Sequence, residues 1–153
     1  KHVNQLVEEN HLRWDSLGEF LALGASFEDM GDKAGNKKAS ILGKALDAAI
    51  GKLLDNNKSP SRKTGELDNR GSQFYLTMYW AQELARQTAD AELAAAFAPI
   101  AQQLADAEAT IVAELNGVQG HSVDIGGYYH PDEAKVAQVM RPSQTLNAVI
   151  DAL

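Results

Sequence analysis

The feature that most constrains the fold of this chain is a set of apolar pairs that recurs every four residues between positions 41 and 54. The pairs are Ile41-Leu42, Ala45-Leu46, Ala49-Ile50 and Leu53-Leu54. Because an α-helix turns once in about 3.6 residues, these pairs share one face of a helix, and polar residues take the other face. We therefore expect an amphipathic helix over this segment.

Two glycines, Gly43 and Gly51, lie inside this expected helix. Each makes a helix interior about 1 kcal/mol less stable than alanine would. Because a residue without a side chain lets another element come close, we interpret both glycines as contact points for a partner helix.

The segment before this helix predicts two more helices. Apolar residues at helical spacing indicate one from Val3 to Leu12, and Ser16 with Glu19 three residues later has the pattern of a capping box at the start of a second. Two glycines and mixed charges from Gly31 to Asn36 predict that the second helix ends there.

The second half of the chain also has helical patterns. The run from Gln73 to Thr88 favours a helix, although its aromatic start would also suit a strand. Asp90 is expected to cap an alanine-rich helix that Pro99 kinks or divides and that Asn116-Gly117 ends.

Prolines delimit the last two expected helices. Pro131 suits the first turn of a short helix, Pro142 breaks that helix, and Ser143 can cap the last one. The predicted fold class is therefore mainly α, with residues 1–153 forming a single helical region.

Composition and charge exclude several classes of function. The chain of 153 residues has 14 basic and 21 acidic side chains and a net charge of −7, which repels nucleic acid and anionic membrane surfaces. No apolar run approaches the roughly 20 residues of a membrane span. The absence of cysteine excludes disulfides, thiol catalysis and thiolate zinc sites. We expect a soluble, cytoplasmic protein, and the first residue, a lysine, suggests a fragment or a processed chain.

A long polar loop from Asp55 to Ser72 is the first candidate binding element. Its part from Lys58 to Arg70 holds four cations (Lys58, Arg62, Lys63 and Arg70) and two anions (Glu66 and Asp68), so its local charge is +2 on a chain of −7. Arginine side chains match phosphate oxygens, and a backbone rich in serine and glycine lets a phosphate come close. The loop is a candidate site for a phosphate-bearing ligand, or else a solvated loop whose charges are incidental.

The N-terminal segment offers a second candidate group, in which Lys1, His2 and Arg13 bracket the first expected helix. His2 and His11 are nine residues apart, a spacing that does not place two zinc ligands on one helical face. We interpret the two histidines as surface or capping residues.

A third candidate group lies near the C-terminus, where His121, His130, Asp132 and Glu133 could hold a metal ion or a phosphate. Neither these residues nor Gly126-Gly127 complete a known short motif for metal or phosphate binding. The short motifs alone therefore assign no enzyme class.

Longer blocks of sequence are more specific than these motifs. They are KHV from Lys1, NHLRWDSLGEFLALG from Asn10, KSPSRKTGELDNRGSQFYL from Lys58, VDIGGYYHPDE from Val123 and MRPSQTLNAVIDAL at the C-terminus. Together they closely resemble the monomeric NADP-dependent isocitrate dehydrogenases, and the resemblance covers essentially the whole chain.

The resemblance implies an oxidoreductase that converts isocitrate into 2-oxoglutarate and CO2 with NADP and a Mg or Mn ion, in the tricarboxylic acid cycle and glyoxylate bypass. It implies that this chain is the helical C-terminal segment of a larger α/β fold, within the cofactor-binding domain of a monomeric enzyme. The catalytic, substrate-binding and metal-binding residues would then lie outside it, and the segment alone would be inactive.

The resemblance also implies which residues of this chain bind the cofactor. They are Lys1, His2, Arg13, Trp14, Asp15 and Arg62. Arg13 and Arg62, with His2, would recognise the ribose 2′-phosphate that distinguishes NADP from NAD. Lys1 would add positive charge, and Asp15 would accept a hydrogen bond from the adenosine portion. The alternative from another class is a freestanding helical interaction module whose basic loop contacts an acidic or phosphorylated partner.

Overall fold

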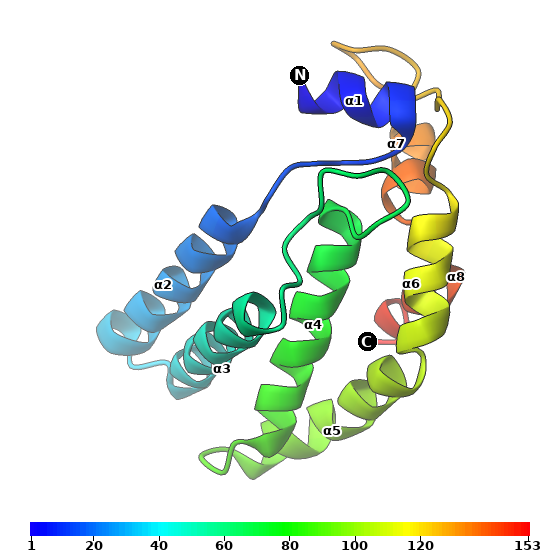
Figure 1. Cartoon of the computed structure of the whole chain (residues 1–153). Coiled ribbons are helices and arrows are strands. Elements are labelled where there is room, and N and C mark those ends of the chain that lie inside the picture. The colour runs from blue at the N-terminus through cyan, green and yellow to red at the C-terminus, as the bar shows by residue number, and fades with distance from the viewer. The chain divides into compact units, whose positions relative to one another are not determined.

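The computed structural model describes residues 1–153 and contains eight α-helices and no strand (Figure 1). In chain order the helices are α1 (His2–Glu9), α2 (Leu17–Ala34), α3 (Lys37–Asp55), α4 (Asn69–Arg86), α5 (Ala91–Asp106), α6 (Glu108–Gly117), α7 (Glu133–Met140) and α8 (Gln144–Ile150). The prediction of a mainly α fold is therefore confirmed, and the aromatic start of α4 is helical.

The chain divides into two compact units, each built from separate stretches of sequence. The first, here called the loop unit, consists of Lys1–Asp15, Ser59–Phe74 and Ala107–Leu153. The second, here called the hairpin unit, consists of Ser16–Lys58 and Tyr75–Asp106. Both units are helical, and the treatment of 1–153 as a single region stays a prediction.

In the hairpin unit α2 and α3 form an antiparallel pair. Gly31, late in α2, meets Ser40, early in α3, whereas Gly24, earlier in α2, meets Leu46, later in α3. The turn between the helices uses Gly35, whose φ of 64° favours glycine, and the next residue caps α3.

The face of α3 that the sequence predicted to be apolar forms the core of the hairpin unit. Leu46, Ala49 and Leu53 have no exposed surface. The ring nitrogen of Trp80 donates to the Leu42 carbonyl at 3.1 Å, and its ring lies 5.9 Å from that of Phe27. Trp80 thereby joins α4 to both helices of the pair.

Gly43 has the role that the sequence predicted, and Gly51 does not. A side-chain carbon at Gly43 would lie 3.0 Å from Cγ of Glu28 and 3.2 Å from the Gly24 carbonyl oxygen, so α2 and α3 approach closely there. A carbon at Gly51 would meet nothing within 4 Å, so the prediction of a helix contact at this position is wrong.

Several predicted start and stop signals are confirmed. The carboxylate of Asp90 accepts from the Leu93 amide at 2.9 Å at the start of α5, and the hydroxyl of Ser143 accepts from the Leu146 amide at 3.1 Å at the start of α8. Each side chain satisfies an amide that the first helical turn leaves without a partner. Helix α6 ends at Gly117, as predicted.

Two signals before α3 are corrected. Ser16 precedes α2, but its ψ of 16° is not the extended conformation of a capping residue, and no capping bond from its side chain forms. Helix α1 ends at Glu9 rather than Leu12, because Asn10 takes a left-handed conformation with φ of 46°.

Three signals after α3 are also corrected. The polar loop ends at Asp68, because α4 begins at Asn69. Pro99 does not divide its helix, since α5 continues to Asp106. Pro131 lies outside α7, whose first amides are capped by Asp132 instead.

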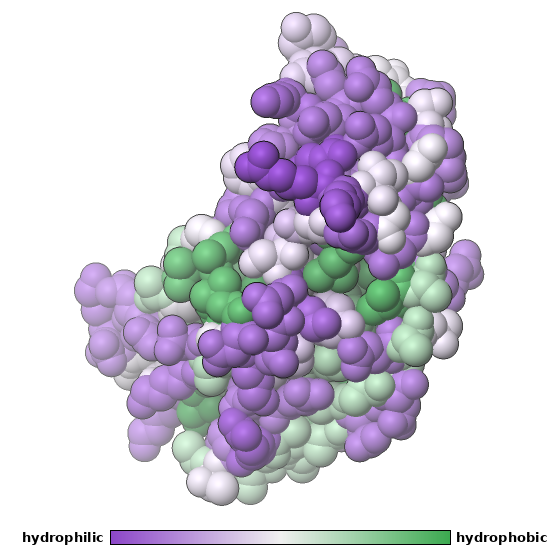
Figure 2. Space-filling model, viewed as in Figure 1, coloured by the Kyte–Doolittle hydropathy of each residue, from purple (hydrophilic) through white to green (hydrophobic).

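Figure 2 shows apolar side chains on the visible surface of α2. The large exposed apolar residues of this helix are Leu21, Leu23 and Met30. None of the helices is long and apolar enough to cross a membrane.

Candidate functional site

All six residues proposed to bind a cofactor lie in the loop unit. Three of its segments meet around them: the link from Asn10 to Asp15, the loop from Ser59 to Asp68, and the end of α6 with the residues after it. Asn10 reverses the chain after α1, and its side-chain amide donates to the Val118 carbonyl at 2.8 Å. The Gly120 amide donates to the Glu9 carbonyl at 2.8 Å.

His11 is completely buried at the centre of these segments. Its Nδ1 lies 2.6 Å from Oε1 of Gln119, and its Nε2 lies 2.9 Å from the Ser61 carbonyl oxygen. The interpretation of His11 as a surface or capping residue is wrong, because the residue joins three segments in the interior.

A buried ion pair fixes the start of α4. Asp68 and Arg70 lie 2.7 Å apart, with 0% and 3% of their side chains exposed. The carboxylate of Asp68 also accepts from the Leu12 amide at 3.1 Å. The guanidinium of Arg70 donates to Oδ1 and the carbonyl of Asn10 and to the Val139 carbonyl, at 2.7–2.9 Å. This arginine holds the fold together and is not available to a ligand.

Most of the charge predicted to form a basic patch is therefore used elsewhere. Besides the buried Arg70, Lys58 lies over the ring of Tyr75 at 4.3 Å within the hairpin unit. Lys63 lies 3.8 Å from the Glu66 carboxylate. Arg62 is exposed, and its guanidinium has no hydrogen bond, ion pair or ring contact, so all of its donors are available.

Arg13 reaches the loop that carries Arg62. Its Nε donates to the Arg62 carbonyl at 2.8 Å, and its Nη1 contacts the carboxylate of Glu9 at 2.5 Å. This hydrogen bond from Arg13 is the main reason why the pKa of Glu9 lies below its usual value of 4.5. Nη2 of Arg13 makes no hydrogen bond within the protein.

His2 and Trp14 form a second contact among the six residues. Their rings meet edge to face with centroids 5.3 Å apart, and 45% of the Trp14 side chain is exposed. Nδ1 of His2 is buried and has no hydrogen-bond partner. Lys1 precedes α1 without forming a side-chain capping bond, and both Lys1 and Asp15 are exposed.

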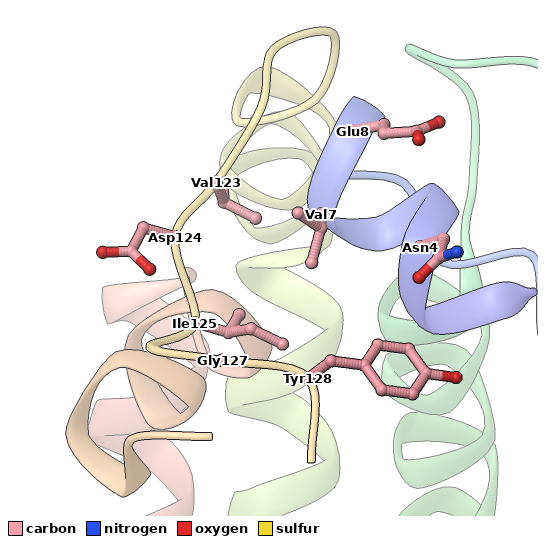
Figure 3. A pocket seen from close by; sticks show the side chains of 8 residues that line it. All are labelled: Asn4, Val7, Glu8, Val123, Asp124, Ile125, Gly127 and Tyr128. Carbon is pink, nitrogen blue, oxygen red and sulfur yellow. The ribbon is translucent and has the colours of Figure 1, made fainter. Parts of the chain in front are cut away.

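A cavity of the loop unit lies elsewhere, between α1 and residues 123–128 (Figure 3). Its volume is about 260 Å³. The lining residues are Asn4, Val7, Glu8, Val123, Asp124, Ile125, Gly127 and Tyr128. Figure 3 shows Val7, Val123 and Ile125 directed toward one another, while the carboxylates of Glu8 and Asp124 point away. None of the six candidate residues lines this cavity, so geometry alone does not connect it with them.

The C-terminal candidate group does not assemble into a site. The carboxylate of Asp132 accepts from the Lys135 amide at 2.9 Å as the cap of α7. Gly126 has a φ of 84°, and a side chain on it would lie 2.6 Å from Cβ of Asp132, so a tight turn accounts for this glycine. The structure contains no group of three histidine, aspartate or glutamate residues placed to hold a metal ion.

Comparison with known proteins identifies the family. The family model described as monomeric isocitrate dehydrogenase matches residues 1–151. The chain belongs to this family. A relative from Mycobacterium tuberculosis, named isocitrate dehydrogenase (NADP) 2, is 71% identical over the whole chain. Relatives from Colwellia maris and Azotobacter vinelandii, also named as NADP isocitrate dehydrogenases, are 60% and 58% identical over the same 153 residues.

The chain spans about a fifth of the length of these relatives, 20% of the first and 21% of the other two. Its eight helices without a strand fit a helical segment of a larger enzyme. Family membership accounts for the whole length of the segment, and no structural observation separately favours an interaction module.

Sequence patterns alone missed the residues that hold this region together. His11, Asn10, Asp68 and Arg70 lie in loops or at helix ends, where apolar periodicity gives no information. The one available signal was the unusual density of polar residues between Asn10 and Asp15 and between Ser59 and Arg70, which is compatible with exposure as well as with a buried network.

Proposed function

We propose that this chain is the C-terminal helical segment of an NADP-dependent isocitrate dehydrogenase and supplies part of the NADP site. The observation that carries the proposal is the 2.8 Å hydrogen bond from the Arg13 guanidinium to the Arg62 carbonyl, because it ties together two arginines that are 49 residues apart in sequence. The names of the relatives support NADP as the cofactor.

The charges of the two arginines suit the group that distinguishes NADP from NAD. A ribose 2′-phosphate carries negative charge and several acceptor oxygens, which an arginine fork can bind with two parallel hydrogen bonds. Arg62 has its whole fork available, and Arg13 has Nη2 available. We infer that the 2′-phosphate binds to both.

His2 and Trp14 fit a bound nucleotide as well. The buried Nδ1 of His2 lacks a partner, and a buried polar atom in that state costs free energy unless a ligand or water satisfies it. The exposed indole of Trp14 offers a flat apolar surface to a base. Lys1 would add positive charge, and Asp15 would accept a hydrogen bond from the adenosine portion.

We infer the rest of the reaction from the family. When bound, NADP would supply the hydride acceptor for the oxidative decarboxylation of isocitrate to 2-oxoglutarate, and Arg13, Arg62 and His2 would bind and orient it. The substrate and the Mg or Mn ion would be bound by residues outside this chain, so the segment alone is expected to be inactive. Both helical units would belong to the cofactor-binding domain of a monomeric, cytoplasmic enzyme.

The test is steady-state kinetics of the full-length dehydrogenase that carries this segment, with NADP and with NAD. Because a charge-assisted hydrogen bond contributes about 1.5–3 kcal/mol, Arg62→Ala should lower kcat/KM for NADP by roughly 10- to 100-fold and leave kcat/KM for NAD unchanged. Arg13→Ala should lower it at least as much, because it also releases the Arg62 carbonyl.

The matched control is Lys63→Ala, which removes the neighbouring cation of the same loop. Since Lys63 is 81% exposed and pairs with Glu66, its loss should change the NADP preference less than about threefold. An NADP preference that stays intact in both arginine variants would refute the proposal. An equal loss in the Lys63 variant would show that only the net charge of the loop matters.

A further inference from the structure

The two ring nitrogens of His11 both face hydrogen-bond acceptors. Nε2 lies 2.9 Å from the Ser61 carbonyl oxygen, which can only accept. Nδ1 lies 2.6 Å from the side-chain amide of Gln119, whose oxygen and nitrogen could in principle be exchanged. The orientation of that amide decides whether Nδ1 donates a hydrogen bond, and so carries a proton, or accepts one.

The loop that carries Arg62 fixes the amide of Gln119. Oε1 accepts from the Gly65 amide at 2.7 Å, and Nε2 donates to the Glu66 carbonyl at 2.9 Å. Exchanging the two atoms would place donor against donor and acceptor against acceptor. The oxygen of Gln119 therefore faces His11, and only an imidazolium has an N–H on both ring nitrogens to donate to both acceptors.

The charged groups around His11 are compatible with a cation. On α1, the pKa of the Glu9 carboxyl is lowered, mainly by the hydrogen bond from Arg13, which favours its ionised form. In the loop, Asp68 is paired with Arg70, and Glu66 contacts Ser61 and Lys63. The end of α6 contributes the neutral amides of Asn116 and Gln119.

Together these bonds hold the loop at four points between Ser61 and Glu66. His11 binds the Ser61 carbonyl, Arg13 binds the Arg62 carbonyl, and Gln119 binds the amide of Gly65 and the carbonyl of Glu66. Arg62 is itself one of the held residues, and the bond at Ser61 lies directly beside it. A binding group whose backbone is already fixed loses less entropy when a ligand binds.

We propose that His11, as an imidazolium, and Gln119 are positioning residues that hold Arg62 in place and thereby set the preference for NADP over NAD. This inference rests on the function proposed above. It assigns the two residues no contact with the cofactor, because the cation at His11 has no exposed surface.

The test uses Gln119→Ala and His11→Gln in the full-length dehydrogenase that carries this segment. Each variant removes at least one bond to the loop, so KM for NADP should rise about tenfold while KM for NAD and kcat with saturating NADP stay unchanged. Gln119 is partly exposed, so its variant should fold even if the buried His11 variant does not. The control is Ser143→Ala, a buried capping residue of the same unit away from this loop, which should change neither KM.

A double-mutant cycle separates this inference from the proposed function. If Gln119 acts through Arg62, Gln119→Ala should have no further effect on KM for NADP in the Arg62→Ala background. A full effect in that background, or equal effects on NADP and NAD, would overturn the inference and leave the role of Arg62 intact. An Arg62→Ala variant with unchanged NADP preference would refute the proposed function and this inference with it.

The charge on His11 can be observed directly. With ¹⁵N-labelled histidine in the full-length protein, the His11 signals, assigned by their loss in His11→Gln, should show protons on both ring nitrogens under the assay conditions. A spectrum with one protonated and one bare ring nitrogen would contradict the imidazolium.

Discussion

Both units have a buried apolar core, which in the loop unit includes Phe74, Ile111 and Leu115, but the loop unit also has a buried polar network. In the hairpin unit, α2 and α3 pack through small and apolar residues, with Leu46 completely buried and Gly43 at the closest approach. In the loop unit, the completely or nearly completely buried residues include His11, Asp68 and Arg70. Apolar packing tolerates adjustment of shape, whereas a buried polar network fails as a whole when one member loses its partner.

The candidate binding residues all lie in the loop unit, whose geometry depends on buried polar contacts. Arg13 and Arg62 extend from loops, and hydrogen bonds to buried or partly buried polar groups fix those loops. A ligand site on loops therefore depends on the polar network for its geometry. The predictions below test that contrast by hydrogen exchange of peptides from each unit, in the full-length protein that carries this segment.

The largest effect is expected from Arg70→Ala in the loop unit. The variant leaves the Asp68 carboxylate buried without its cation, which should destabilise the unit by about 3–5 kcal/mol. Exchange in peptides from residues 59–74 should accelerate accordingly. The control is Lys33→Ala, which breaks an exposed ion pair within α2 and should cost less than about 1 kcal/mol. Equal effects of the two variants would contradict the structural role of the buried pair.

The next largest effect is expected from Leu46→Ala in the hairpin unit. Leu46 has no exposed surface, so the substitution leaves a cavity and should destabilise the unit by about 2–5 kcal/mol. Peptides from α2 and α3 should exchange faster. Leu21→Ala is the matched control, since Leu21 is 50% exposed and its change should stay within about 1 kcal/mol. If Leu46→Ala destabilised the hairpin unit no more than Leu21→Ala does, α3 would not form the core of this unit.

Smaller changes in stability, opposite in sign to each other, are expected when the two glycines of α3 are replaced by alanine. Gly43→Ala should destabilise the hairpin unit by about 1–3 kcal/mol, because the new carbon would press on Glu28 and on the Gly24 carbonyl. Gly51→Ala should stabilise it by up to about 1 kcal/mol, because alanine favours a helix and open space surrounds the position. Two shifts in the same direction would disprove the close approach at Gly43.

The smallest effect is a pH dependence at Glu114 in the loop unit. The hydrogen bond from Ser143 is the main cause that lowers its pKa below the usual 4.5, and bonds from Thr145 assist. Because the folded state favours the ionised form, this stabilisation is complete above the unfolded pKa and is lost as the pH falls through the folded pKa. Glu114→Gln should abolish the acid-induced increase of exchange in α8 and leave α2 and α3 unchanged. A pH profile identical to that of the native protein would contradict this role.

The parts of the fold that could be predicted are those with a local cause. The apolar pairs of α3, the cap at Asp90 and the cap at Ser143 each depend on residues within one or two helical turns. Ser16 shows the limit of such signals. Its sequence matches a capping box, but its backbone does not take the extended conformation that a capping residue needs.

The candidate site could be predicted only in the identity of its residues, through the family resemblance. The bond from Arg13 joins it to a carbonyl 49 residues away, and those from His11 reach 50 and 108 residues away. Such partners are set by the tertiary fold and leave no periodic pattern. For the same reason the sequence places Arg70 among the cations of a polar loop and does not reveal that its ion pair with Asp68 is buried.

Arg13 and Arg62 differ in how many of their guanidinium nitrogens bond to the protein itself, and this difference matters for protein engineering. Two of the three guanidinium nitrogens of Arg13 already serve the architecture, whereas those of Arg62 serve none of it. A redesign that aims to switch the coenzyme from NADP to NAD should therefore begin by randomising position 62 and keep the arginine at position 13. Libraries built in that order would sample new specificities while keeping the hydrogen bond from Arg13 to the loop that carries position 62.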